Sequence, residues 1–129
     1  MISFDAFTWD SESPIYHQIV RFIKRGVAAG SIRDGEEMPS RRVLSARLGV
    51  NPNTIQKAYR ILEEEGLVTS HAGAKSYITL APGQMASVRR QLVEAEAGRL
   101  VAGLRQSGLT KDEALALMER LWDEREEER

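Results

Sequence analysis

The sequence contains no cysteine and only two histidines, His17 and His71, among its 129 residues. Without cysteine there is no disulfide scaffold, no thiolate metal site and no cysteine nucleophile. Two histidines far apart in the sequence disfavour a histidine-based metal cage. No segment approaches the roughly 18 apolar residues of a membrane-spanning helix, and residues 1–13 do not resemble a signal peptide. We expect a cytoplasmic protein with no metal, no cofactor and no membrane partner.

Recognisable catalytic motifs are also missing. The sequence has no Walker loop, no dinucleotide fingerprint and neither the HExxH nor the GxSxG pattern. Glu63, Glu64 and Glu65 could suggest paired catalytic carboxylates. However, consecutive residues on a helix point in different directions, and no nucleophile or base accompanies them. We therefore predict that the protein is not an enzyme.

Charge is distributed unevenly along the chain, although the formal net charge is only -1. Residues 14–80 carry ten Lys and Arg against six Asp and Glu, whereas residues 1–13 and 81–129 are both net acidic. Residues 41–60 contain five basic residues and no acidic one. Such a local concentration of positive charge indicates a polyanionic partner, nucleic acid above all.

Three helices are predicted in the basic region, each introduced by a Ser or Asn that can act as an N-cap. They cover residues 14–29, 40–48 and 51–65, with Ser13 expected to cap the first of them. Two short helices separated by a turn that contains glycine are typical of a helix-turn-helix. The residues of the middle helix that we expect to face inward are Val43, Leu44 and Leu48.

A two-stranded hairpin is predicted directly after the third helix. Residues 67–71 and 76–80 are rich in β-forming residues and are joined by a short connection. A helix-turn-helix followed by such a hairpin is a winged helix. The first 13 residues are predicted to form an extended arm that docks Ile2, Phe4, Phe7 and Trp9 on this domain.

The last third of the chain predicts a helical hairpin. Ala81-Pro82-Gly83 is a candidate linker, so we divide the chain into residues 1–80 and 81–129. Helices are expected over 84–106 and from Thr110 onward, where Thr110 and Glu113 form a capping-box pattern. Because two helices alone bury little apolar surface, we expect a second copy to complete a bundle. The residues assigned to this dimer contact are Leu100, Leu104, Leu117, Met118, Leu121 and Trp122.

The third helix is the candidate reader of DNA bases, because the first turn of a recognition helix meets base edges in the major groove. An Asn side chain can form two hydrogen bonds with one adenine, and the Thr methyl group can contact the thymine methyl group. Some of these residues also have ordinary structural roles: Asn51 doubles as a helix cap, and His71 suits a plain surface position. The full set of candidate DNA-binding residues is Ser40, Arg41, Arg42, Asn51, Asn53, Thr54, Lys57, His71, Gly73 and Lys75.

The strings PIYHQI and MPSRRVLSARLGVNPNTIQKAYRILEEEGL, together with the hairpin, resemble the DNA-binding domain of the GntR family of bacterial transcription regulators. The resemblance covers residues 14–80, and the short two-helix tail is similar to that of the YtrA subfamily. It implies a mainly helical winged-helix protein that binds double-stranded operators as a homodimer and represses. It also implies control of its own operon and of nearby genes, ABC transporter genes among them. The family's arginine falls on Arg42 and its wing-tip glycine on Gly73, whereas Lys75 stands where the family usually has glycine.

Two further interpretations are kept beside this one. A small-molecule effector could bind the C-terminal hairpin, with Met118 and Trp122 lining a pocket instead of a dimer contact. The winged helix could also serve as a scaffold for a protein partner, although an adaptor has no need for the basic cluster in residues 41–60.

Overall fold

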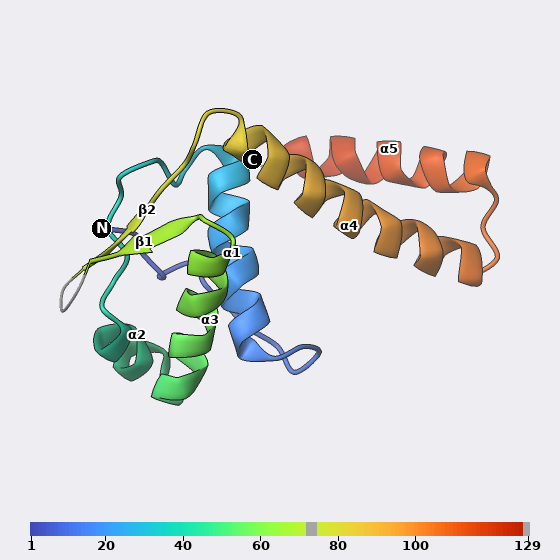
Figure 1. Ribbon diagram of the computed structural model, residues 1–129. Helices are drawn as coiled ribbons and strands as arrows, with labels where there is room; N and C mark the ends of the chain where they lie inside the picture. Colours follow the sequence, from blue (N-terminus) through green and yellow to red (C-terminus); the bar gives the residue numbers. More distant parts are fainter. Residues whose placement is uncertain (72–74, 128–129) are drawn as a thin grey trace. The chain divides into compact units, whose positions relative to one another are not determined.

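The computed structural model describes residues 1–71 and 75–127, so Gly73 lies outside the described residues. Within them the chain forms the predicted mainly α fold with one two-stranded antiparallel sheet. The elements, labelled in Figure 1, are α1 (Ile15–Ala29), α2 (Arg41–Leu48), α3 (Pro52–Glu64), β1 (Val68–Ser70), β2 (Ser76–Ile78), α4 (Gln84–Gln106) and α5 (Lys111–Glu127).

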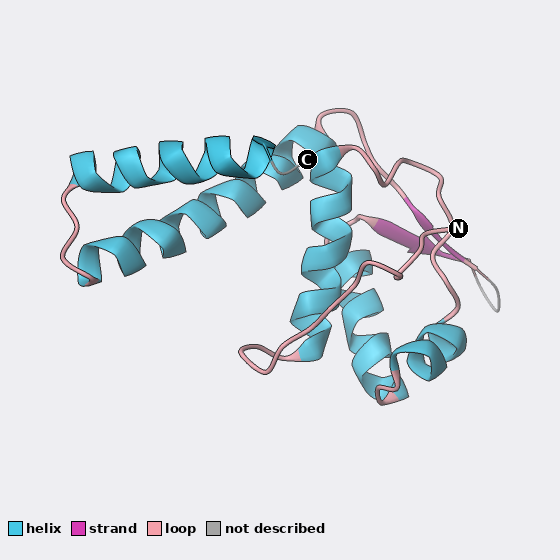
Figure 2. Cartoon of the chain, turned by 180° about the vertical axis from the view of Figure 1, so that it is seen from behind, coloured by secondary structure: helices cyan, strands magenta, loops and turns pink. Residues whose placement is uncertain are grey.

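The chain divides into two compact units, Met1–Leu92 and Val93–Arg129. In the first unit α1 and α2 both pack against α3, and β1 follows α3 directly (Figures 1 and 2). The division falls inside α4 because its first turns belong to the first unit: Val88 is buried there, and Arg89 Nε donates to the Ala28 carbonyl.

The core of the first unit is mostly aliphatic, with one fully buried tyrosine. Its fully buried side chains come from α1, α2, α3 and β2, and from the segments just before α2 and β1. The largest of them are Tyr59, Ile19, Ile23, Met38, Leu44, Ile55, Leu62, Leu67, Ile78 and Val27.

The N-terminal arm completes this core. Ile2, Phe4 and Phe7 are buried, and the Ile2 amide donates to the Glu37 carbonyl. The Phe4 and Phe7 rings both pack on Phe22 of α1. Trp9, which is also expected to dock, is 45% exposed and stacks on Phe7.

Most predicted helix ends are confirmed. Gly30 ends α1 with a left-handed backbone (φ 81°), which glycine adopts without steric cost. Ser40 caps α2 by accepting from the Val43 amide, and Asn51 caps α3 by accepting from the Asn53 amide. The prediction for Ser13 is wrong, because Pro14 takes the N-cap position of α1 and no side chain caps that end.

The prediction that Val43 faces inward is also wrong, since its side chain is 53% exposed. The inner face of α2 is formed by Leu44 and Ser45, whose hydroxyl donates to the Val50 carbonyl at 2.6 Å. In a helix of two turns, three apolar residues do not determine which side faces the core.

The hairpin forms in the predicted place and is the wing of a winged helix. β1 and β2 pair in antiparallel register from Val68 opposite Ile78 to Ser70 opposite Ser76. The segment before α2 continues the sheet on the other side of β2, where the Met38 amide donates to the Ser76 carbonyl. Backbone bonds on both sides therefore hold β2 in place.

The second unit contains the rest of α4 and all of α5. The predicted capping box is present: the Glu113 carboxylate accepts from the Thr110 amide, and the Thr110 hydroxyl accepts from the Glu113 amide. The hydrogen bond that the Thr110 amide donates to the carboxylate lowers the pKa of Glu113. No helix among residues 1–71 and 75–127 is long and apolar enough to cross a membrane.

Candidate nucleic-acid interface

The first two turns of α3 present polar and basic side chains to solvent. Asn53 and Lys57 are exposed and Thr54 is half-buried, whereas Ile55 on the opposite side is fully buried. The Asn51 side-chain oxygen accepts from the Asn53 amide at 2.8 Å, and its side-chain NH2 group is available to a ligand. The predicted reading helix thus has an exposed N-terminal turn anchored by its own cap.

Lys57 is held by an interaction that the sequence analysis missed. Its Nζ lies 4.0 Å from the centroid of the Tyr16 ring at the start of α1, a cation–π contact. The contact bridges two helices and orients the ammonium group on the exposed face. The helical pattern alone could not reveal it, because Tyr16 and Lys57 are far apart in the sequence.

The two neighbouring arginines of α2 differ. Arg42 is exposed and has no partner among residues 1–71 and 75–127, so its guanidinium is available to an anion. Arg41 is turned toward the protein: its Nη2 donates to Glu63 Oε1 at 2.7 Å, and its guanidinium lies 4.8 Å from the Tyr59 ring centroid. Sequence spacing could not separate these two residues, which the structure assigns different surroundings.

Tyr59 lies with its ring beneath the Arg41 guanidinium. Its side chain is fully buried, and its hydroxyl donates to the Pro39 carbonyl at 2.5 Å. Burial raises the pKa of Tyr59, and the nearby Arg41 charge opposes this only in part. The tyrosine is therefore a neutral structural group that ties α3 to the segment before α2.

The wing contributes a second set of candidates. Lys75 is exposed with its Nζ 3.4 Å from Glu37 Oε1, and the His71 ring lies 5.7 Å from the Tyr77 ring. The His71 amide donates to the Lys75 carbonyl, which closes the described part of the hairpin. The third wing candidate, Gly73, lies outside the described residues.

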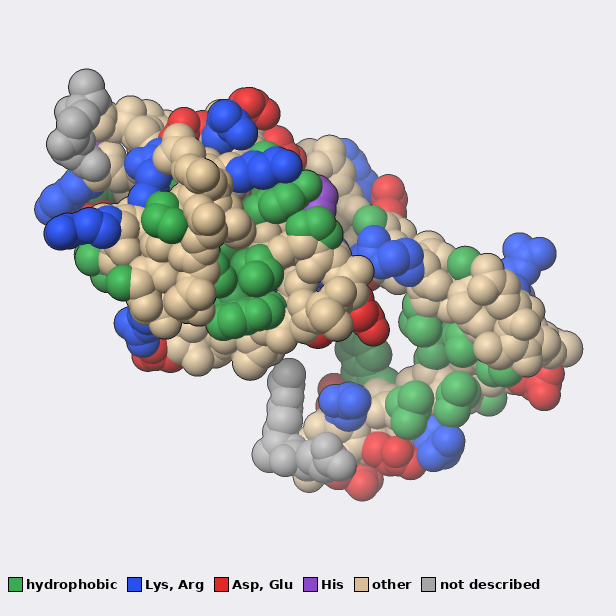
Figure 3. Space-filling view, turned by 90° about the horizontal axis from the view of Figure 1, so that it is seen from below, with side chains coloured by type: hydrophobic (Ala, Val, Ile, Leu, Met, Phe, Trp, Pro, Cys, Tyr) green, Lys and Arg blue, Asp and Glu red, His purple; other side chains and the backbone are tan. Residues whose placement is uncertain are grey.

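Figure 3 shows the first unit from the side where α2 and the start of α3 lie in Figure 1, with Lys and Arg side chains around an apolar patch and some Asp and Glu side chains among them. The Lys and Arg side chains agree with the five basic residues, and no acidic one, among residues 41–60 of the sequence. The described residues contain no group of three or more His, Cys, Asp or Glu placed to hold a metal ion. The exposed Arg42, Asn53 and Lys57 offer a partner positive charge and hydrogen-bond donors on this face.

The second unit exposes the apolar residues that were assigned to a dimer contact. Leu100, Met118, Leu121 and Trp122 are 46%, 39%, 43% and 70% exposed, and no residue of α5 is buried. Leu104 and Leu117, which were assigned to the same contact, are half-buried. A large exposed apolar face on a helix is typical of an interaction surface.

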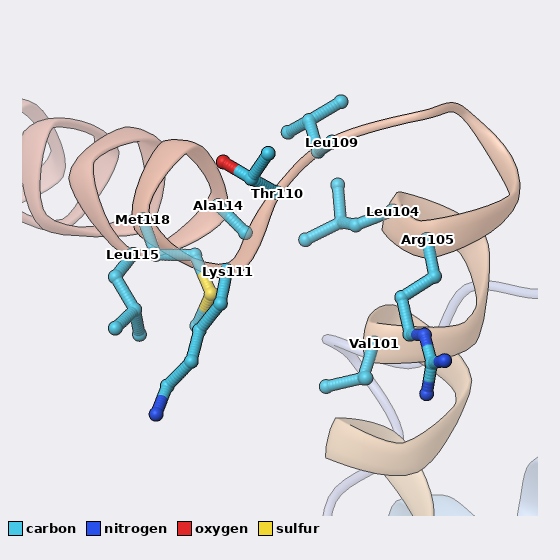
Figure 4. Close-up of a pocket in the computed structure, with 9 residues that line it drawn as sticks. All are labelled: Val101, Leu104, Arg105, Leu109, Thr110, Lys111, Ala114, Leu115 and Met118. Carbon is cyan, nitrogen blue, oxygen red and sulfur yellow. The ribbon is translucent and has the colours of Figure 1, made fainter.

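A cavity of about 470 Å³ lies between α4 and α5 near their connection. Figure 4 shows Val101 and Leu104 of α4 facing Ala114 and Met118 of α5 across it, with Arg105 and Lys111 among the lining residues. Met118 thus lines a pocket, as one interpretation expected, whereas Trp122 is not part of its lining. A small-molecule effector there stays a prediction.

The chain is similar to known bacterial regulators. The model of the family "Bacterial regulatory proteins, gntR family" matches residues 15–78. The HTH-type transcriptional repressor YtrA of Bacillus subtilis (strain 168) is 38% identical over 88 residues, covering 64% of this chain and 68% of that protein.

Solved structures resemble the chain over most of its length. A GntR family transcriptional regulator from Listeria monocytogenes has a TM-score of 0.77 at 28% identity, covering 87% of this chain and 98% of that one. YtrA from Sulfolobus acidocaldarius, a GntR-family transcription factor, has a TM-score of 0.53 at 29% identity, covering 95% and 97%. The similarity therefore extends beyond the winged helix into the C-terminal helices.

Proposed function

The chain belongs to the gntR family of bacterial regulatory proteins, and from this membership we propose that it is a dimeric repressor whose winged helix binds an operator. As a member it is a DNA-binding transcriptional regulator and not an enzyme, and its relatives support a place in the YtrA-like subfamily. The name of the Bacillus subtilis relative supports repression as the direction of control.

The observation that carries the proposed DNA contact is the exposed first turn of α3 beside the exposed Arg42. In this reading Asn53 and Thr54 contact base edges, and Arg42 and Lys57 contact phosphates or guanine. His71 and Lys75 on the wing add backbone contacts. Because phosphate contacts release counterions, the affinity should fall steeply with salt.

Operator binding is tested by fluorescence anisotropy with DNA from upstream of the chain's own gene, against random DNA, at two salt concentrations. Arg42→Ala is expected to cost at least about 1 kcal/mol of binding free energy. It should also lower the slope of log affinity against log salt by about 1, the value for one phosphate contact. Arg99→Ala removes the same charge from the second unit and is the matched control. Equal binding by wild type and Arg42→Ala would remove Arg42 from the interface.

We propose that a second copy of the chain covers the apolar face of α5. The exposed Leu121 and Trp122 support this, because a face of this kind buried between copies stabilises a dimer. Two winged helices would then reach half-sites about 34–36 Å apart if they use successive major grooves.

The dimer is tested by sedimentation at micromolar concentration. Leu121→Glu places a charge in the proposed interface and is expected to shift the protein to monomer. Ala116→Glu adds the same charge to an exposed position on the other side of α5 and should leave the dimer intact. A Leu121→Glu variant that remains dimeric contradicts this interface.

The targets that we propose are the regulator's own operon and nearby ABC transporter genes, and we place its action in the cytoplasm, where bacterial DNA lies. The resemblance to the YtrA subfamily supports these assignments. Mapping of the bound DNA in cells tests them, and the absence of these promoters from the bound fraction would contradict the assignment.

A further inference from the structure

Four polar side chains meet where α2, α3 and the wing come together, and we name them the Arg41–Glu63 cluster: Arg41, Glu63, Ser70 and Ser76. Glu63 Oε1 accepts from Arg41 Nη2 at 2.7 Å and from the Ser70 hydroxyl at 2.5 Å. Arg41 Nη2 also donates to Ser70 Oγ at 3.3 Å, and Ser70 Oγ lies 2.8 Å from Ser76 Oγ. Because each residue comes from a different element, one small cluster connects α2, α3, β1 and β2.

The cluster lies at the outer end of the paired strands of the wing, at Ser70 and Ser76. At the inner end, Val68 and Ile78 pair across the hairpin and are buried in the apolar core. The next pair on that face is Ser70 opposite Ser76, and Ser76 is only 4% exposed. Apolar packing therefore holds the inner end of the paired strands, while the hydrogen bond from Ser70 to Glu63 holds their outer end.

The cluster also determines whether the Arg41 guanidinium is available to bind a phosphate. Its guanidinium is neutralised by Glu63 and lies over the Tyr59 ring, and its Nε is the buried polar side-chain atom left without a hydrogen-bond partner among residues 1–71 and 75–127. A guanidinium held in this way has little free charge to offer a phosphate. Its neighbour Arg42 has no such partner in the described chain and points to solvent.

We propose that Glu63 is a positioning residue for DNA recognition, which fixes the start of α2 and the outer end of the wing relative to α3. This rests on the proposed operator binding. Glu63 binds Arg41, which precedes Arg42, and Ser70, which precedes His71, so a single carboxylate sets two of the proposed DNA contacts. Arg41 then acts through Glu63 and contacts no phosphate.

Hydrogen bonds to an ionised group are about twice as strong as neutral ones, so loss of the carboxylate charge should release both partners together. We expect Glu63→Gln to weaken operator binding about tenfold, as loss of a charge-assisted hydrogen bond predicts. Glu64→Gln is the matched control, because Glu64 is an exposed neighbour on α3 without a partner among the described residues. Both substitutions also remove a negative charge that repels the DNA phosphates. If this repulsion were the whole effect, both variants would bind the operator more tightly, and that result would overturn the proposal.

A double-mutant cycle distinguishes positioning from mere stabilisation of the fold. We expect Lys75→Ala to weaken operator binding in the wild type and to have little further effect in the Glu63→Gln background, because the wing is already displaced. Equal effects of Lys75→Ala in both backgrounds would overturn the proposal. Thermal unfolding of each variant establishes that folded protein is compared, and Ser70→Ala provides a milder second variant with the same expected direction.

The salt dependence of binding tests the role of Arg41. Arg42→Ala should lower the slope of log affinity against log salt by about 1, the value for one lost phosphate contact. Arg41→Ala should weaken binding with the slope unchanged; a slope lowered by the same amount would make Arg41 a direct contact and overturn its assignment. If the wild type does not prefer its operator, the proposed function fails and this inference with it; if it does and Glu63→Gln binds equally well, only the positioning role fails.

Discussion

Tyr59→Phe removes one oxygen atom from the centre of the winged helix and leaves the ring in place. The lost hydroxyl donates to the Pro39 carbonyl at 2.5 Å, and both residues are buried. Phenylalanine cannot replace this donor, so a buried carbonyl is left without a partner. An orphaned group of this kind costs about 1–3 kcal/mol, and we expect the free energy of unfolding at pH 7 to fall by about 1–2 kcal/mol.

The same substitution has a second effect at high pH. Burial raises the pKa of Tyr59 in the folded state above its ordinary value of 10.0. Above pH 10 the unfolded chain loses this proton while the folded chain keeps it, so the stability present below pH 10 is lost as the pH rises. The loss approaches about 1.4 kcal/mol per pH unit in the wild type and is absent in Tyr59→Phe. The difference in unfolding free energy between the wild type and Tyr59→Phe should therefore decrease above pH 10 and vanish near pH 11.

Urea unfolding followed by Trp9 fluorescence measures this in the first unit, with Trp122→Phe introduced so that the second unit gives no signal. Tyr77→Phe is the matched control, because the Tyr77 hydroxyl has no hydrogen-bond partner among the described residues. The reasoning is refuted if Tyr59→Phe matches the wild type at pH 7, or if both proteins lose stability in parallel above pH 10.

Three further predictions concern the crowded Gly26 and the cap residue Asn51. Gly26→Ala would place a Cβ 2.4 Å from Ile32 Cδ1, so a buried side chain must move; we expect a loss of about 1–3 kcal/mol of unfolding free energy, whereas the same change at the open Gly98 should cost nothing. Asn51→Ala should cost about 1 kcal/mol through the lost cap of α3. Asn51→Asp should keep the cap and the stability but weaken operator binding by charge repulsion, and unchanged anisotropy in that variant would exclude Asn51 from the interface.

The elements could be predicted because their ends carry local chemical signals. Gly30, Ser40 and Asn51 act on backbone groups within a few residues of themselves, so sequence alone reveals them. Pro14 shows the limit of this rule, since its fixed φ also suits the N-cap position and displaced Ser13 from the expected role. Val43 shows another limit, because the direction of a short helix is decided by what packs against it.

For the candidate site, the sequence predicts which residues face solvent, and their contact with DNA stays a prediction. Arg42, Asn53 and Lys57 follow from their place on two helices, and the structure presents all three on the surface. Arg41 and Glu63 are 22 residues apart, and their ion pair depends on the packing of α2 against α3. A sequence pattern carries no information on such a contact. For that reason the sequence suggests for Glu63 only the role of a catalytic carboxylate, which the missing nucleophile and base disfavour.

The first turns of α4 limit how the DNA-binding part can be isolated. A fragment that ends at Leu80, where sequence punctuation suggests a boundary, would lack Val88 from the core and the Arg89 donor of the Ala28 carbonyl. It would also lose Gln84, whose side-chain amide bonds the Gly66 carbonyl after α3. A monomeric DNA-binding fragment for structural work or for fusion to other proteins should therefore extend to Leu92. The fragment that ends at Leu80 should be the less soluble of the two.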